Sequence, residues 1–449
     1  MSLPRYPKYK HSGVEWLGDV PEHWRTRRLK HVCRAFPSNV DKKSYEDEQP
    51  VTLCNYTDVY YNDRIVADME FMQATASPDQ IEKFGLRSGD TIITKDSETA
   101  DDIAVSSYVP DDLPGVVCGY HLSIVRPRVG THGSFVKRLF DSAYTQACVA
   151  VRANGLTRVG LSQYDIDNIE WPWPPAAEQR AIASFLERET AKIDALIGEQ
   201  RQLVELLKEK RQAVISHAVT KGLNPDAPMK PSGVEWIGHV PAHWQIVRLG
   251  HYASIENGTT PNRDDQQYWH GGNVPWLTSG QVNQYQVVEA SEFITETAVR
   301  ECSLRPLPIG TILVGLIGQG KTRGAAAILQ IEACINQNLA AVLPSQSWEP
   351  DFLLYLFQSM YDYLREFGRG GNQAALNCQI LAALEVPLPP KGEQVQICRH
   401  LSVALQSLQR LGAESVTAVG LLHERRMALT SAAVTGQIDV RDCVPERVT

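Results

Sequence analysis

The 449-residue chain has no uninterrupted apolar run of the roughly 18 residues that a membrane-spanning helix needs, and no apolar segment follows its N-terminal positive charges. We therefore expect neither membrane insertion nor export, and we place the protein in the cytoplasm. Its nine cysteines contain no Cys-x-x-Cys pair and are odd in number. This favours reduced, mostly buried thiols over disulfides or a zinc site, so no bound metal is expected.

Sequence motifs of catalysis are also missing. The chain contains no G-x-S-x-G elbow, no H-E-x-x-H pair, no Cys/His dyad and no Asn-Pro-Pro-Tyr motif of adenine methyltransferases. One pattern of the P-loop type, G-x-x-x-x-G-K-[ST], spans residues 315–322. It has no counterpart in the first half of the chain, and Arg323-Gly324 lead into a strand-like run instead of a helix. A binding protein is therefore expected, with a P-loop nucleotide hydrolase as the alternative.

The chain contains a repeat. Ser12-Gly-Val-Glu-Trp16 recurs 220 residues later as Ser232-Gly-Val-Glu-Trp236, and Pro21-Glu-His-Trp24 recurs as Pro241-Ala-His-Trp244. The sequence Pro-Pro-Ala-Ala-Glu-Gln at residues 174–179 recurs as Pro-Pro-Lys-Gly-Glu-Gln at 389–394. Two separated blocks that recur in the same order indicate a duplicated module with fixed ends and a divergent middle. We expect pseudo-twofold symmetry and two different binding lobes.

Each Pro-Pro block precedes one long helix. Apolar residues at alternating spacings of four and three, typical of a coiled-coil seam, follow both blocks, and Gly222 and Gly436 mark the helix ends. The two helices are expected to pair antiparallel and to act as a spacer. The predicted seam residues are Ile182, Leu186, Ile193, Leu196, Leu203, Leu207 and Val214, and then Ile397, Leu401, Leu408, Leu411, Leu422 and Leu429. Two separate amphipathic helices, each packed on its own lobe, are the alternative.

The segments between the blocks alternate short strands with helices, so we expect an α+β fold: two pseudo-symmetric recognition domains with mixed β cores, separated by the helix pair. The predicted strands are 51–55, 91–94, 103–108 and 116–125 in the first half and 274–278, 311–317, 325–331 and 338–343 in the second. Helices are expected at 135–149 and 351–367. The predicted domains are 1–173, 174–222 (first spacer helix), 223–388, 389–440 (second spacer helix) and a tail at 441–449.

The charge distribution neither proves nor excludes a nucleic-acid partner. The net charge is −8, yet residues 1–34 carry eight Lys or Arg against three acids, whereas residues 41–113 are acidic. Glycine-rich loops with basic and amide side chains can approach DNA phosphates and base edges. The candidate DNA contacts are Lys95, Ser97, Thr99, Arg152 and Arg158 in the first half, and Gln319, Lys321, Arg323, Arg369, Asn372 and Gln373 in the second.

The repeated aromatic residues are interpreted as core residues of the shared scaffold rather than as a base-stacking platform. Both copies keep Trp16/Trp236 and Trp24/Trp244, while residues that read sequence should differ between copies. His23 and His243 lack a second ligand at metal-binding spacing, so they are interpreted as structural histidines.

Together the SGVEWLGDVPEHW and SGVEWIGHVPAHW blocks, the PPAAEQ and PPKGEQ helix starts and the KTRG loop resemble the specificity (S) subunit of type I restriction-modification systems, over essentially the full length. The resemblance implies two target-recognition domains, each reading half of a split double-stranded DNA site. It implies two methyltransferase (M) subunits, optionally two restriction (R) subunits, and no catalysis by this chain. S-adenosylmethionine, ATP and Mg would be bound by those partners, not by this chain. A free-standing DNA-binding regulator is the alternative.

Overall fold

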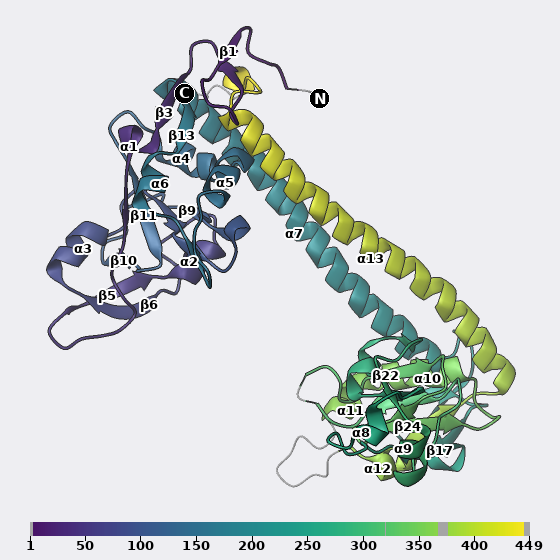
Figure 1. Cartoon of the computed structure of the whole chain (residues 1–449). Coiled ribbons are helices and arrows are strands. Elements are labelled where there is room, and N and C mark those ends of the chain that lie inside the picture. The colour runs from purple at the N-terminus through teal and green to yellow at the C-terminus, as the bar shows by residue number, and fades with distance from the viewer. Residues whose placement is uncertain (1–2, 319, 367–375, 444–449) are drawn as a thin grey trace. The chain divides into compact units, whose positions relative to one another are not determined.

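The computed structural model describes residues 3–318, 320–366 and 376–443. The chain forms two compact units, residues 1–201 with 417–449 and residues 202–416. Each unit contains one β-rich lobe and a segment of each of two long helices, α7 (Ala176–Lys221) and α13 (Lys391–Val434), as Figure 1 shows. The predicted α+β class with two β-rich domains and two long helices is confirmed.

Both long helices begin just after the predicted Pro-Pro pairs and end just before the predicted glycines. Each follows a Pro-Pro pair. Proline disrupts the interior of a helix but is tolerated at its start, so each helix begins just after its pair. Gly222 and Gly436 follow the last turns with φ of 75° each, a left-handed conformation that glycine adopts without a steric penalty. The second helix therefore ends before residue 440, the limit predicted for it.

The helices pack together within each unit (Figure 1). In the first unit, Ile182 and Leu186 of α7 share a hydrophobic core with Ala433 and Val434 of α13. In the second unit, the far end of α7 shares a core with the start of α13, through Val219 and Ile397 among others. The beginning of each helix thus packs with the end of the other, which confirms the antiparallel pairing.

The predicted seam is well covered near the lobes and poorly covered in the middle of the helices. Ile182, Leu186, Ile193, Ile397 and Leu401 are buried; Leu207, Val214, Leu408, Leu422 and Leu429 are partly buried. Three predicted members, Leu196, Leu203 and Leu411, are at least 40% exposed. Beside Leu196, Ile197 is 4% exposed and takes the covered position. The exposed positions follow from helix geometry. A straight helix has 3.6 residues per turn, so residues in a heptad pattern move gradually off the contact face unless the two helices supercoil.

The first lobe has two principal sheets. One has the order β4-β11-β7-β9 and is antiparallel; the other has the order β10-β5-β6, with β10 parallel to β5. The strands are β1 Tyr9–His11, β2 Asp19–Pro21, β3 Arg25–Arg28, β4 Cys33–Pro37, β5 Gln49–Cys54, β6 Met72–Ala76, β7 Thr91–Thr94, β8 Asp96–Ser97, β9 Ser106–Tyr108, β10 Val116–Cys118, β11 Leu122–Pro127, β12 Val159–Gly160 and β13 Glu170–Trp173. The helices are α1 Leu29–Val32, α2 Tyr56–Tyr60, α3 Pro78–Phe84, α4 Gly133–Phe140, α5 Ala143–Ala150 and α6 Gln163–Asp167.

The second lobe repeats this topology and adds one strand, β19, which pairs parallel with β22 at the edge of the larger sheet. Its sheets have the orders β17-β24-β21-β22-β19 and β20-β18-β23, again with one parallel pair, β18 and β23, in the smaller sheet. The strands are β14 Met229–Pro231, β15 His239–Pro241, β16 Gln245–Arg248, β17 Ala253–Asn257, β18 Val274–Leu277, β19 Gln286–Val287, β20 Glu292–Ile294, β21 Ile312–Gly315, β22 Ala326–Leu329, β23 Cys334–Ile335, β24 Leu339–Pro344 and β25 Glu385–Leu388. The helices are α8 Gln266–Trp269, α9 Glu296–Glu301, α10 Pro350–Ser359, α11 Tyr361–Glu366 and α12 Cys378–Ala383.

Three predicted elements are divided in the structure. The strand expected at 116–125 is two strands in different sheets, β10 and β11, because the chain crosses between sheets at Gly119, whose N–H donates to the Cys54 carbonyl oxygen. The helix expected at 135–149 is α4 and α5, separated where Ser142 caps the start of α5. The helix expected at 351–367 is α10 and α11, and residue 367 lies outside the described residues.

The repeated glutamate connects the two recurring blocks of each module through hydrogen bonds. Glu178, in the first turn of α7, accepts hydrogen bonds from the Tyr6 hydroxyl (3.2 Å) and from Trp24 Nε1 (2.9 Å), and contacts His23 Nε2 at 2.6 Å. Glu393 in α13 binds His243 and Trp244 in the same way, at 2.8 and 3.0 Å. The interpretation of both histidines as structural agrees with these contacts.

The tryptophans of the repeat are not all buried. Trp24 and Trp244 lie in the core, as expected for the shared scaffold. Trp236 is half-buried and stacks on Tyr363. Trp16 is 59% exposed, so its assignment to the core was wrong.

All nine cysteines are free thiols. In the part of the chain that the structure describes, no helix is long and apolar enough to cross a membrane. Among the same residues, no group of three or more His, Cys, Asp or Glu side chains is arranged to hold a metal ion.

Candidate nucleic-acid interface

In the first lobe the structure brings the two predicted contact loops together. The short strand β8 pairs antiparallel with β12, with Ser97 opposite Val159 and Asp96 opposite Gly160. The N–H of Leu161 also donates to the Lys95 carbonyl oxygen, at 3.0 Å. The loop that follows β7 and the loop that follows α5 therefore form one surface, although about 60 residues of sequence separate them.

The predicted residues of this surface differ in how they are placed. Arg158 is half-exposed, and Thr99 is exposed. Lys95 is partly covered and its Nζ donates to the Ser38 carbonyl oxygen at 3.4 Å. Arg152 turns back onto its own helix, where Nη1 donates to the Cys148 carbonyl oxygen at 2.7 Å. Ser97 is only 2% exposed, because β8 points its side chain into the lobe and away from the surface.

A hollow lies beside this surface. Its volume is about 230 Å³, and its lining is mostly apolar, with Tyr56, Tyr120 and His121 among the lining residues. Burial raises the pKa of Tyr56, a side-chain hydrogen bond with Ser97 opposes that rise, and the charges of Asp102 and Asp96 add to it. The hollow and the paired loops are therefore parts of one region of the lobe.

The second lobe presents the equivalent connection, residues 316–325 between β21 and β22, as a basic glycine-rich loop. Two side chains of helix α11 donate hydrogen bonds to the backbone of this loop. The Tyr361 hydroxyl donates to the Lys321 carbonyl oxygen at 3.0 Å, and Arg365 Nη1 donates to the Gly320 carbonyl oxygen at 2.7 Å. The Lys321 side chain is exposed, and Arg323 is half-buried. The other predicted contacts of this lobe, Gln319, Arg369, Asn372 and Gln373, lie outside the described residues.

The P-loop alternative is wrong on geometry. A P-loop needs a helix directly after its Lys-Thr pair, so that the helix N-terminus and loop amides face the phosphates. Here Gly324 has a φ of 77°, and strand β22 follows from Ala326. The loop joins two antiparallel neighbours in one sheet.

Several residues of the site were not found from the sequence. In the first lobe these are Asp96, which pairs with Arg158, and His121, which contacts Asp96; in the second they are Tyr361 and Arg365. The sequence offered one usable signal, since Asp96 lies between two predicted contacts. His121, Tyr361 and Arg365 come from other elements, and only the tertiary fold places them at the loops.

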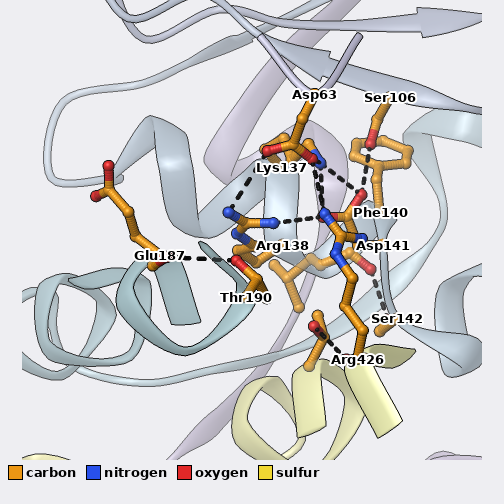
Figure 2. Close-up of polar contacts among 12 residues, drawn as sticks. Asp63, Ser106, Lys137, Arg138, Phe140, Asp141, Ser142, Glu187, Thr190 and Arg426 are labelled. Atoms are coloured by element: carbon orange, nitrogen blue, oxygen red, sulfur yellow. Dashed lines mark hydrogen bonds and ion pairs between the residues drawn. The ribbon is translucent and has the colours of Figure 1, made fainter. Parts of the chain in front are cut away.

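A cluster of ion pairs connects the first lobe to α13 (Figure 2). Lys137 and Arg138 of α4 are nearly covered and form ion pairs with Asp63 and Asp141. Arg426 of α13 reaches the same Asp63, with Nη2 3.1 Å from Oδ1. Burial alone would raise the pKa of Asp63, but the charges of Lys137, Arg138 and Arg426 outweigh it and lower the pKa. The cluster thus links α4, α13 and the loop after α2.

The second lobe uses aromatic groups at the corresponding place. Arg211 of α7 stands at the position that corresponds to Arg426, 215 residues earlier. Its guanidinium lies over the Tyr285 ring, 5.8 Å from the centroid. Tyr285 and Tyr355 share a hydrogen bond, and burial is the largest cause of the raised pKa of both. Gln212 Nε2 donates to the Gln358 carbonyl oxygen at 3.0 Å.

The chain is similar to known proteins in both sequence and fold. A family model, the type I restriction modification DNA specificity domain, matches residues 241–411. The MjaIX specificity subunit of Methanocaldococcus jannaschii is 32% identical over 171 residues, 37% of this chain and 39% of that subunit. The chain thus matches about two fifths of the length of that relative. A putative MjaX specificity subunit from the same organism is 22% identical over 436 residues, 95% of this chain and 96% of the relative.

One solved structure, from work on complex assembly and conformational transition of the type I R-M system, covers 92% of this chain and 98% of its own, with a TM-score of 0.70 and 20% identity. At that identity the likeness concerns the fold. The matched domain covers residues 241–411, and the relatives show that the chain is similar to type I restriction-modification specificity subunits over most of its length.

Proposed function

We propose that this chain reads a split, asymmetric DNA site, with one half-site read by each lobe, and that the helix pair sets the gap between the halves. The observation that carries the proposal is the contrast between the lobes. Their sheets share a common strand order, to which the second lobe adds β19, while their corresponding loops differ in length, partners and charge. A shared scaffold with unlike contact loops is what two different half-sites require.

Phosphate contacts would position each lobe, and loop side chains would specify the bases. The exposed Lys321 and the half-buried Arg323 supply positive charge to the second lobe despite the net charge of −8. In the first lobe, Lys95, Thr99, Arg152 and Arg158 remain the candidate contacts. Arg152 would have to leave its carbonyl partner to reach DNA.

The chemistry would reside in partner chains. We propose that two modification subunits dock on this chain and methylate adenine with S-adenosylmethionine, and that two restriction subunits using ATP and Mg can join them. The assembly named for the structurally similar protein supports a place in a complex of this kind. This chain would contribute the DNA address.

The proposal is tested by changing the length of the helices. Four residues inserted after Gln200 of α7 lengthen that helix by about 6 Å, or on the order of two base pairs of duplex. We expect the full chain, co-expressed with its modification subunits, to methylate a motif with the same half-sites and a gap wider by one or two base pairs. Sequencing of modified adenines across the host genome measures the gap directly.

A control variant of unchanged length separates spacing from surface chemistry. Glu205 and Lys208 form an exposed ion pair on α7, each side chain 67% exposed, and Glu205→Ala with Lys208→Ala removes it without moving either lobe along the helix. This variant should keep the original gap. An insertion variant that is active and methylates the original gap would contradict the spacer role.

A further inference from the structure

Arg158 and Asp96 form an ion pair across the short β8–β12 ladder of the first lobe. Arg158 Nη2 lies 3.1 Å from Asp96 Oδ1. Asp96 belongs to β8, and Arg158 directly precedes β12, so the ladder fixes the separation of the two backbones. Asp96 is 21% exposed at its side chain and Arg158 50%. The carboxylate is therefore set into the lobe, and the guanidinium stands at the surface.

A second contact holds the carboxylate in place. His121 Nδ1 lies 2.7 Å from Asp96 Oδ2, and the His121 ring packs against Tyr120 with 3.7 Å between ring centroids. Both rings line the hollow of about 230 Å³ described above. Asp96 thus has one oxygen directed to His121 and the other to Arg158. This arrangement limits the positions that the guanidinium can adopt.

Most donors of Arg158 remain available. A guanidinium has five N–H donors in a planar fork, and its contact with Asp96 is an ion pair, since Oδ1 of Asp96 accepts no aligned hydrogen bond. The planar fork of a guanidinium matches the O6 and N7 acceptors of guanine in the major groove. A guanidinium that an ion pair restrains near its place of use also loses less side-chain entropy on binding than a free one does.

We propose that Arg158 reads a guanine in the half-site of the first lobe, and that Asp96 is the positioning residue that orients it. This inference rests on the proposed function, because it specifies one contact of the recognition that the first lobe performs. The second lobe cannot use the same device at its corresponding loop, since residues 316–325 contain no acidic residue. An arginine that an acidic residue orients toward guanine would therefore be used by the first lobe and not by the corresponding loop of the second.

The test uses the full chain in complex with its modification subunits. The wild-type complex is first mapped by sequencing modified adenines, and its binding is then measured on duplexes in which each G·C pair of the first half-site is replaced in turn. We expect Arg158→Ala to abolish one guanine preference of about tenfold to a hundredfold, with the second half-site unchanged. Arg158→Lys should lose the same preference while keeping its positive charge, because an ammonium lacks the fork.

The role of Asp96 is tested by its effect on base preference. Asp96→Asn should reduce the guanine preference several-fold while Arg158 is still present, and Asp96→Glu should restore part of it. A residue that only stabilised the lobe would weaken binding to all sequences equally. The matched control is Arg28→Ala, because Arg28 is 49% exposed and pairs with Glu170 across the β3–β13 ladder, away from the loops. It should leave the base preference intact.

The outcomes separate this inference from the proposed function. A wild-type complex that methylates no split motif would overturn the proposed function, and this inference with it, before any variant is made. A split motif that keeps every base preference in both Arg158→Ala and Arg158→Lys would overturn this inference alone. A first half-site without a G·C pair would do the same.

Discussion

The two lobes share a common strand order, apart from the extra strand β19 of the second, but contact the long helices through different chemistry. The first lobe rests on an ionic cluster in which Asp63 meets Lys137, Arg138 and Arg426. The second rests on aromatic rings, with Arg211 over Tyr285. Residues 426 and 211 are arginines at corresponding positions, so the duplication kept the helix side chain while the lobe side of the contact changed.

The loops that we assign to DNA differ even more. Residues 95–105 of the first lobe contain one lysine and four acids, whereas residues 316–325 of the second contain two basic residues and no acid. In each lobe this loop lies between two strands that are neighbours in the larger sheet, β7 and β9 in the first lobe and β21 and β22 in the second. The difference shows that the sheets fix where each loop lies, while its charge and partners are left to vary.

The largest effect is expected at the repeated glutamates. Glu178 has three partners in Tyr6, His23 and Trp24, and its side chain is 11% exposed; the Glu393 side chain has two partners and is 25% exposed. Glu178→Ala leaves more buried donors unpaired, so we expect it to lower the free energy of unfolding by about 3 kcal/mol, against about 1 to 2 kcal/mol for Glu393→Ala. Urea unfolding with hydrogen exchange would localise each loss to its own lobe. Equal losses would contradict the comparison.

The ionic cluster should make the first lobe sensitive to acid. Because the pKa of Asp63 is lowered in the folded state, its stabilisation is complete above its unfolded pKa and is lost as pH falls through the folded value. We expect Asp63→Asn to cost about 2 kcal/mol near neutral pH, less than a fully buried pair because Asp63 is 40% exposed. The cost should shrink below about pH 4.

Tyr285→Phe in the second lobe is the matched comparison for the acid test. It removes one neutral hydrogen bond, worth about 1 kcal/mol, and the loss should not depend on pH between about 3 and 7, since the pKa of Tyr285 is raised. Urea unfolding of both variants over this range measures the difference. A pH-independent loss in Asp63→Asn would contradict the ionic account of the first lobe.

A smaller effect is expected from loop charge. Lys321→Ala with Arg323→Ala should weaken DNA binding by about tenfold, reduce the slope of log affinity against log salt by about two, and change only the half-site of the second lobe. In the first lobe, Glu98→Gln with Asp101→Asn should instead strengthen binding to non-specific duplex, because both acids are exposed. Salt titrations of binding would measure both. A change confined to the other half-site would refute the lobe assignment.

The sequence predicted those helices and strands whose bounds are set by residues within them or next to them. The strand expected at 91–94 is β7, with the same bounds, and the first spacer helix, expected at 174–222, begins at Ala176, two residues after the first of two prolines. Prolines, glycines and runs of β-branched residues act within a few residues of themselves. Strand breaks at Gly119 and helix breaks at Ser142 and Met360 were missed, because they depend on which sheet or helix the chain joins next.

The candidate site was only partly predictable for the same reason. Lys321 and Arg158 are exposed on loops, as the glycines and charges around them indicated. Ser97 was misplaced because the two-residue strand β8, which buries it, exists only through pairing with β12. The acidic partner of Arg158 was adjacent to predicted contacts, yet nothing in the sequence paired residues 96 and 158.

The sequence by itself determined the duplication, the two long helices with their glycine ends, and the family to which the residue blocks point, since each is recorded in residues close together or repeated at a fixed distance. The tertiary structure decided which turns of the helices are covered, how each lobe contacts them, and which side chains meet at the loops. Those features depend on contacts between residues far apart in the chain, and the energies of such contacts are set by burial and geometry that no local pattern specifies.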